Sequence, residues 1–286
     1  MFIQKKADFY QSIAFFMVKL FSFVVFAFLI FMLGFIFKSG YSALSWEFIS
    51  AAPYSEMTKG GIFPAIVGTF CLVLGSCVVS IPLGIITAIY LNEYATNYRL
   101  VKFIRLGVNN LAGVPSVVFG LFGLTLFVIL FDFRVSILAG SLTLGILNLP
   151  IVIRSTEESL MTVPMTYREA SLSLGATRWQ TISKIVLPNA LAGILTGIIL
   201  SMGRTAGETA PIMFTAAVFF TPHLPVSIFC EVMALPYHIY VMATAGTHIE
   251  ATRHIQYGTV IVLLALVLLL NLTGIILRTR FKRRYR

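Results

Sequence analysis

Long apolar stretches with charged residues at their ends are the feature that most limits what this chain can fold into. Only 11% of its 286 residues are charged, whereas a water-soluble domain carries about a quarter charged residues. About 20 apolar residues in a helix cross the hydrocarbon core of a bilayer. The pattern therefore predicts an integral membrane protein and excludes a soluble enzyme.

Six apolar runs are long enough to cross a bilayer as helices. They cover about residues 13–37, 62–91, 106–131, 135–153, 190–220 and 255–277. The first run follows Lys5 and Lys6 but is too long for a cleaved signal sequence, so we expect it to be retained as a helix. The sequence thus predicts an all-α, polytopic membrane protein with six transmembrane helices.

The distribution of the 21 Lys and Arg residues predicts the orientation. With both termini cytoplasmic, most of them lie on the cytoplasmic side: Lys5, Lys6, Arg99, Lys102, Arg105, Arg154, Arg168, Arg178, Lys184, Arg278, Arg280, Lys282, Arg283, Arg284 and Arg286. The outer side then has Lys38, Lys59, Arg134 and Arg253. The positive-inside rule favours this orientation, with both termini cytoplasmic. Anionic lipid and topology explain the net charge of +10, and no nucleic-acid partner is expected.

Two loops are too long to be mere connections, and long loops usually carry function. The cytoplasmic loop covers residues 154–188 and the outer loop covers 221–254. We divide the chain into an N-terminal segment over 1–60, with the first helix and an outer loop, a five-helix core over 61–278, and a basic cytoplasmic tail over 279–286.

Two capping-box patterns predict a pair of short helices in the cytoplasmic loop. Thr166 is followed by Glu169, and Thr177 by Gln180, with Gly175 permitting a bend between them. We expect this hairpin to end at a proline, Pro188. Its apolar residues would dock it onto the bundle or onto a partner: Leu172, Leu174, Trp179, Ile182, Ile185 and Leu187. A charged face would be supplied by Arg168, Glu169, Arg178 and Lys184.

The same loop carries a motif with a fixed spacing. It comprises Glu169, Ala170, Ser171, Gly175, Ile185, Leu187 and Pro188. This spacing resembles the EAA loop (EAA, three residues, G, nine residues, I-x-L-P) of bacterial ABC importer permeases, with Ser171 in place of the second alanine. The resemblance implies that the first short helix is a coupling helix, set in a groove of a separate ATP-hydrolysing subunit. The alternative is an ordinary amphipathic hairpin that merely links two spans.

The resemblance also implies roles for individual residues. Glu169 would make polar contacts with the ATPase, Ala170 and Ser171 would allow close approach, and Gly175 would provide the bend. No Walker A sequence occurs in the chain, so it is expected not to be an enzyme. ATP and Mg would be used by the partner subunit, and no cofactor would be bound by this chain.

The remaining metal-binding and redox signals are weak. The histidines are spaced in no metal-binding pattern and are expected to be solvated or interfacial: His223, His238, His248 and His254. No metal site is expected. The cysteines form no CxxC motif and are interpreted as small core residues: Cys71, Cys77 and Cys230.

Arg204 and Glu208 lie inside the fifth apolar run, where a lipid-facing helix could not accept them. At spacing i, i+4 they share a helical face, which Ser201, Pro211 and Thr215 also approach. We expect both charges to point into the bundle or toward a water-filled path. Pro211 removes a backbone donor and is a candidate helix break. The alternative is an ion pair that only fixes packing.

Small residues and proline shape the same region and the third run. Gly193 with Gly197, and Gly203 with Gly207, form small-xxx-small pairs that allow close helix packing. Pro115 marks either a second broken helix or a tolerated kink.

The charged pair suits an anion, because a guanidinium matches phosphate oxygens in a bidentate fork. Glu208 would either position Arg204 or accept a hydrogen bond from a protonated phosphate while repelling a fully ionised sulfate. Composition alone does not choose phosphate over other anions.

Three stretches resemble the permease subunits of bacterial ABC phosphate importers. They are GRTAGETAP at 203–211, NLAGVPSVVFG at 110–120 and LPVSIF at 224–229. The Ala210-Pro211 ending resembles the PstA type more than the PstC type. On this resemblance the core over 61–278 is an ABC importer permease core, and its substrate path includes Ser201, Arg204, Glu208 and Thr209.

The resemblance implies a set of partners, an alternating-access mechanism and a location in the bacterial cell (inner) membrane. The partners are a homologous permease subunit of the PstC type, a dimer of ATP-binding subunits, an extracytoplasmic phosphate-binding protein and membrane lipid. Two alternatives stay open: an ABC permease for another oxyanion, such as sulfate, molybdate or phosphonate, and an ATPase-independent secondary anion transporter or channel.

Overall fold

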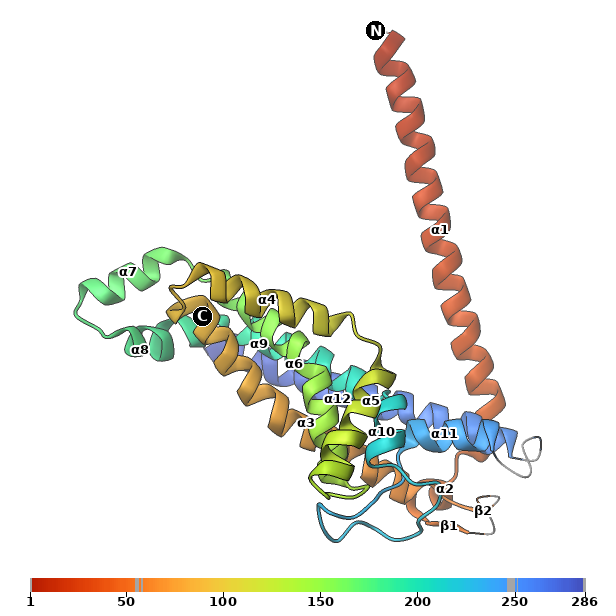
Figure 1. Cartoon of the computed structure of the whole chain (residues 1–286). Coiled ribbons are helices and arrows are strands. Elements are labelled where there is room, and N and C mark those ends of the chain that lie inside the picture. The colour runs from red at the N-terminus through yellow and green to blue at the C-terminus, as the bar shows by residue number, and fades with distance from the viewer. Residues whose placement is uncertain (1, 55–56, 58, 246–249, 251, 285–286) are drawn as a thin grey trace.

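The computed structural model describes residues 2–54, 57, 59–245, 250 and 252–284, and these form a mainly helical structure (Figure 1). The long helices are α1 (Phe2–Gly40), α3 (Phe63–Ile89), α4 (Tyr98–Ala112), α6 (Ile137–Met161), α9 (Leu187–Thr205) and α12 (Arg253–Arg284). The shorter helices are α2 (Trp46–Ser50), α5 (Ser116–Gly123), α7 (Met165–Ser173), α8 (Arg178–Thr181), α10 (Ala210–Thr215) and α11 (Leu235–Thr244). The described residues also form a 3₁₀ turn, η1 (Tyr41–Ala43), and a hairpin of β1 (Pro53–Tyr54) with β2 (Lys59–Gly60). Three segments are π-helical: η2 (Tyr90–Tyr94), η3 (Leu124–Leu130) and η4 (Ile182–Val186).

The predicted all-α, polytopic membrane architecture is confirmed. Among the described residues, five helical segments are long and apolar enough to cross a membrane: Gln11–Ala43, Phe63–Tyr94, Ile137–Met161, Arg178–Thr205 and Arg253–Phe281. If α4 and the segment Ser116–Leu130, which is bent from it, are counted together as one span, these residues contain up to six candidate membrane spans.

The third predicted span is not a single helix over 106–131. Helix α4 begins earlier, at Tyr98, and the helix that follows α4 is bent from it by 101°. Pro115 lies at the break as the N-cap of α5. Proline has no N–H to donate and disfavours helical backbone in the preceding residue, which accounts for the break.

The fifth predicted span, over 190–220, begins earlier in the structure and is interrupted before Pro211, the candidate helix break. Pro188 does not end the preceding helix, because α8, η4 and α9 form one helical segment from Arg178 to Thr205. Pro188 lies where the π-helical η4 passes into α9, and the chain stays helical across it. The chain then breaks after Thr205 and resumes as α10, with Pro211 in its first turn.

Small side chains bring α6 and α9 close together. A Cβ atom added at Gly193 would collide with Ser159, and one at Gly197 with Ser155, both on α6. The predicted close packing is thus confirmed for this pair of glycines. For the other pair it holds at Gly203, where an added Cβ would meet the side chain of Asn271 on α12, but not at Gly207, which faces only the carbonyl of Arg204 in its own chain segment. Since α9 is fixed against α6, the end of α9 has a defined position.

The two ends of the bundle carry different elements (Figure 1). Helices α7 and α8 project from one end, and α11 with the β-hairpin lies at the other. Helix α1 extends away from the bundle and meets α12 near its own C-terminal end, where Phe35 packs edge-on against Tyr257 at a ring distance of 5.6 Å. Most side chains of α1 from residue 11 onward are exposed.

Candidate functional site

The break between α9 and α10 places two charges beside each other. Arg204 lies in the last turn of α9, and Glu208 lies in the linker that follows. The Nε of Arg204 donates to Oε1 of Glu208 at 3.2 Å. The Glu208 side chain is 13% exposed, whereas that of Arg204 is 52% exposed. Among the described residues neither Nη group of Arg204 has a partner, so this end of the guanidinium is free to bind a ligand.

A buried amide holds the end of α9 against α6. The Nδ2 of Asn148 donates a hydrogen bond to the hydroxyl of Thr205, and that hydroxyl donates to the carbonyl of Ser201 at 2.8 Å. The Oδ1 of Asn148 is buried and has no hydrogen-bond partner in the described structure. This contact fixes the residue next to Arg204 while Arg204 itself stays on the open side.

Helix α10 is packed tightly against α5. A Cβ atom at Gly120 would meet Pro211 and Phe214, and one at Gly123 would meet Thr215. Thr215 is buried and donates to the carbonyl of Pro211 at 2.9 Å. Both α9 and α10 are therefore fixed, and the linker between them is the open element.

The break divides the polar residues expected to form one stripe. Ser201 is buried inside the bundle, like Thr215, whereas Arg204 is exposed. Thr209 is partly buried and precedes α10 without a side-chain cap. The prediction that one helical face carries all these groups is wrong, because Glu208 lies outside regular helix.

The second region is the helical hairpin at the other end of α9. Gly175 has φ +84° and follows α7, and an added Cβ there would meet nothing within 4 Å, so the backbone angle rather than crowding requires glycine. The capping box of Thr177 with Gln180 at the start of α8 is confirmed. The one at Thr166 is wrong, because α7 begins at Met165, directly after Pro164, without a side-chain cap.

Most of the hairpin surface is exposed. Glu169 and Ala170 face outward, and so do large apolar side chains: Met165, Tyr167, Leu172, Leu174 and Trp179. The apolar residues predicted to dock the hairpin thus divide into two groups. Ile182 is buried against the bundle, whereas Leu174 is 89% exposed. Ile185, Leu187 and Pro188 are partly buried at the start of the long helical segment.

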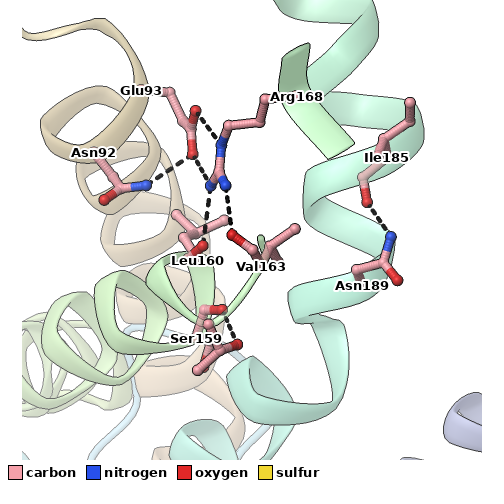
Figure 2. A network of polar contacts seen from close by, with 9 residues as sticks. Asn92, Glu93, Ser159, Leu160, Val163, Arg168, Ile185 and Asn189 are labelled. Carbon is pink, nitrogen blue, oxygen red and sulfur yellow. Dashed lines mark hydrogen bonds and ion pairs between the residues drawn. The ribbon is translucent and has the colours of Figure 1, made fainter. Parts of the chain in front are cut away.

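Arg168 is not on an exposed charged face, as the sequence predicted, but buried beneath α7. Figure 2 shows its guanidinium directed at Glu93, in the π-helical η2, with bonds from Nη2 to Oε1 at 2.7 Å and from Nε to Oε2 at 3.2 Å. The same guanidinium donates to the carbonyls of Val163 at 2.7 Å and Leu160 at 3.0 Å. Asn92 donates to Glu93 at 2.7 Å. These bonds satisfy a buried charge that would otherwise be costly.

A pocket of about 540 Å³ lies beside this network. Its lining includes Glu93 and Asn92 from η2, Arg168 and Leu172 from α7, and Thr181 from α8. Helix α7 therefore stands partly off the bundle, with the Arg168 side chain reaching across.

Sequence reasoning missed Glu93 and Asn148. Each is a polar residue at or within an otherwise apolar run, which is costly in a membrane and usually marks a partner or a function. That cost is a signal that could have singled them out. Their partners, 75 and 57 residues away, could not be read from spacing.

The histidines differ from one another. His223 and His254 are exposed, and His248 lies outside the described residues. His238, expected to be solvated or interfacial, is instead buried in α11, where burial lowers its pKa to about 4. The prediction was wrong there because α11 is covered by α12 and α3.

This geometry defines a multi-pass helical membrane protein with a broken helix and an exposed helical hairpin. Residues 80–286 match the family model described as "Binding-protein-dependent transport system inner membrane component". The chain therefore belongs to that family of membrane transport permeases.

Individual relatives agree with this assignment. The chain is 34% identical over 263 residues to the "Probable ABC transporter permease protein YqgI" of Bacillus subtilis, covering 88% of this chain and 89% of that one. It is 38% identical over 232 residues to the "Phosphate transport system permease protein PstA 1" of Mycobacterium tuberculosis, covering 81% and 74%. A solved structure of the MetNI methionine ABC transporter, in an inward-facing conformation, shares the fold with a TM-score of 0.59 and 20% identity, covering 77% and 94%.

Proposed function

We propose that this chain is the PstA-type permease subunit of an ATP-driven phosphate importer. The observation that carries the proposal is the half-exposed Arg204, paired with Glu208 at a helix break inside an apolar bundle. An intramembrane charge with free donors marks an ion or substrate path. Relatives named as phosphate transport system permeases support the choice of cargo.

The chemistry of the pair favours phosphate. Two free Nη groups can donate to two phosphate oxygens in a bidentate fork. The carboxylate of Glu208 can accept a hydrogen bond from a protonated phosphate oxygen, and it repels a fully ionised sulfate. Thr209, partly buried and next to Glu208 in the chain, belongs to the proposed path, whereas Ser201, expected there from the sequence, is buried inside the bundle instead.

Helix α7 is proposed as the coupling helix. Its exposed Glu169 and Ala170, the apolar groups beside them and the bend at Gly175 suit a groove in a separate ATP-binding subunit. Ser171 faces inward instead, toward Thr181. The residues Ile185, Leu187 and Pro188 carry the motion into α9. ATP and Mg belong to that partner, and this chain performs no hydrolysis.

The proposed complex contains two such permeases, of PstA and PstC type, a dimer of ATP-binding subunits and an extracytoplasmic phosphate-binding protein. Both termini of this chain are cytoplasmic in the inner membrane. ATP binding draws the coupling helices together and opens the path outward, and hydrolysis resets it inward. Motion at α7 reaches Arg204 because α8, η4 and α9 are one helical segment.

The test is uptake of labelled phosphate, with sulfate as control, in cells that express the full set of subunits. This chain is either wild type or Arg204→Gln. We expect ATP-dependent phosphate uptake that the variant loses while it still co-purifies with its partners. Absence of phosphate uptake by the wild type would refute the cargo. Undiminished uptake by the variant would reduce Arg204 to a packing residue.

A further inference from the structure

The coupling helix α7, which the structure describes in full, buries two side chains, those of Arg168 and Ser171. Both are polar and both are bonded. Arg168 joins α7 to η2 and to the C-terminal end of α6, and Ser171 joins it to Thr181 of α8 at 2.9 Å. Within residues 165–173 every apolar side chain is exposed. Any force applied to α7 therefore passes through these two contacts, through the packing of α7 against η4 and through the backbone.

The Arg168 contact is the one that reaches other spans. Its bidentate bond to Glu93 extends to the segment that continues α3, and its bonds to Leu160 and Val163 extend to the end of α6. The Arg168 and Glu93 side chains are 11% and 10% exposed, so water competes little for these bonds. The pocket beside them leaves few other contacts between α7 and this side of the bundle.

A π-helical segment presents Glu93. In η2 the hydrogen bonds run from i to i+5, which changes the direction of the side chains at the end of α3 relative to a regular α-helix. Such segments are frequent at functional sites.

We infer that Arg168 and Glu93 are positioning residues that make the coupling helix move as one body with the cytoplasmic ends of α3 and α6. This inference rests on the proposed function, because it assumes that α7 receives the motion of an ATPase. Without the pair, α7 would still bind its partner through its exposed face, but the motion would reach α9 alone.

Two readouts test this in the assembled complex, reconstituted in proteoliposomes. The first is phosphate taken up per ATP hydrolysed. For Arg168→Gln we expect this ratio to fall about tenfold or more, as for the loss of a charge-assisted hydrogen bond, with ATPase subunits still bound. Arg105→Gln is the matched control, because Arg105 forms an ion pair with Glu157 at 3.0 Å that does not involve α7. That variant should keep the wild-type ratio.

The second readout is a distance between two spin labels, and it does not depend on phosphate transport. Spin labels replace two exposed residues, Ser173 at the end of α7 and Thr96 just after η2, after the three native cysteines are changed to alanine. In the wild type we expect a narrow distance distribution that is the same with and without a non-hydrolysable ATP analogue. In Arg168→Gln the distribution should broaden.

The double variant Glu93→Arg with Arg168→Glu restores an ion pair with the charges exchanged, and so it tests the bonds to the two carbonyls separately. It should not restore coupling, because a glutamate at 168 cannot donate to the carbonyls of Leu160 and Val163. If Arg168→Gln fails to assemble, Glu93→Gln decides by the same two readouts, since it keeps the bonds to both carbonyls.

The inference is overturned if the variant keeps the wild-type uptake per ATP, or if the wild-type label distance shifts on nucleotide binding. If instead the wild type takes up no phosphate, the proposed cargo fails, and the label distances still decide whether α7 moves with α3.

Discussion

Two ion pairs near opposite ends of the helical segment from Arg178 to Thr205 show opposite designs. Arg168 bonds to a carboxylate from another helix and to two backbone carbonyls, and it is buried. Arg204 makes one contact, to a carboxylate four residues later, and half of its side chain is exposed. The first guanidinium commits four of its five N–H donors to the protein, whereas the second commits one.

The difference shows that residue type alone does not identify a substrate site. Both arginines are costly in or near a membrane, and each has an acidic partner. What separates them is the number of unused donors and the access to them. An arginine with most of its donors bonded fixes one element to another, whereas an arginine at a helix break with most of its donors unused suits the proposed anion site.

The largest expected effect is a difference in stability between variants of the two arginines. Arg168→Gln should destabilise the protein by about 3–5 kcal/mol, because it leaves the buried Glu93 carboxylate without its partner. Arg204→Gln should cost less, about 1–3 kcal/mol, because it removes a single contact between a half-exposed arginine and a largely buried carboxylate. The measurement is the thermal unfolding of each detergent-solubilised complex. Equal losses for the two variants would mean that burial does not distinguish the pairs.

The next prediction concerns the rate of phosphate transport when Arg204 is replaced. Arg204→Lys keeps the charge but loses the planar fork, so phosphate uptake should fall about tenfold, in line with one lost charge-assisted hydrogen bond. The measurement is the initial rate of labelled phosphate uptake at saturating external phosphate, normalised to the amount of assembled complex. An unchanged rate would show that charge suffices at this site.

Glu208→Gln provides the selectivity control for that measurement. An amide no longer repels a fully ionised oxyanion, so sulfate should compete better with phosphate than in the wild type. Unaltered competition would assign Glu208 to positioning Arg204 only.

A smaller effect concerns the contact that positions α9. Gly197→Ala should destabilise the bundle by about 1–3 kcal/mol, because its methyl group would collide with Ser155 of α6. Gly107→Ala in α4 is the matched control, since an added Cβ there meets nothing within 4 Å. That substitution should be neutral or stabilise the helix by up to about 1 kcal/mol. The same unfolding assay measures both, and identical behaviour would contradict the close packing.

Much of this fold could be predicted from the sequence, because membrane spans depend on a composition that is local. The Gly193 and Gly197 pair and the capping box at Thr177 could also be predicted, since both follow short spacing rules. The breaks were harder to place. A proline at 115 permits a bend of 101° but does not require one, and Pro188 in a first turn ended nothing.

The two arginines mark the limit of such prediction. The pairing of Arg204 with Glu208 was expected from a separation of four residues, and it forms although α9 ends at Thr205 and Glu208 lies in the linker. The pairing of Arg168 with Glu93 depends on how α3 and α6 pack, which places η2 beneath α7. No local rule fixes which face of a short surface helix turns inward, and for this reason the prediction of an exposed Arg168 was wrong.

The smallest effect tests the second anchor of α7. Thr177→Ala removes the side-chain cap of α8 and should cost about 1 kcal/mol. Because α8 carries Thr181, the partner of Ser171, fraying of α8 should loosen α7 while leaving the Arg168 bonds intact. Uptake per ATP should therefore fall by less than in Arg168→Gln, and Thr177→Ser, which retains the capping hydroxyl, should restore it. A loss as large as that of Arg168→Gln would mean that α8, and not the contact with α3 and α6, carries most of the motion from the coupling helix.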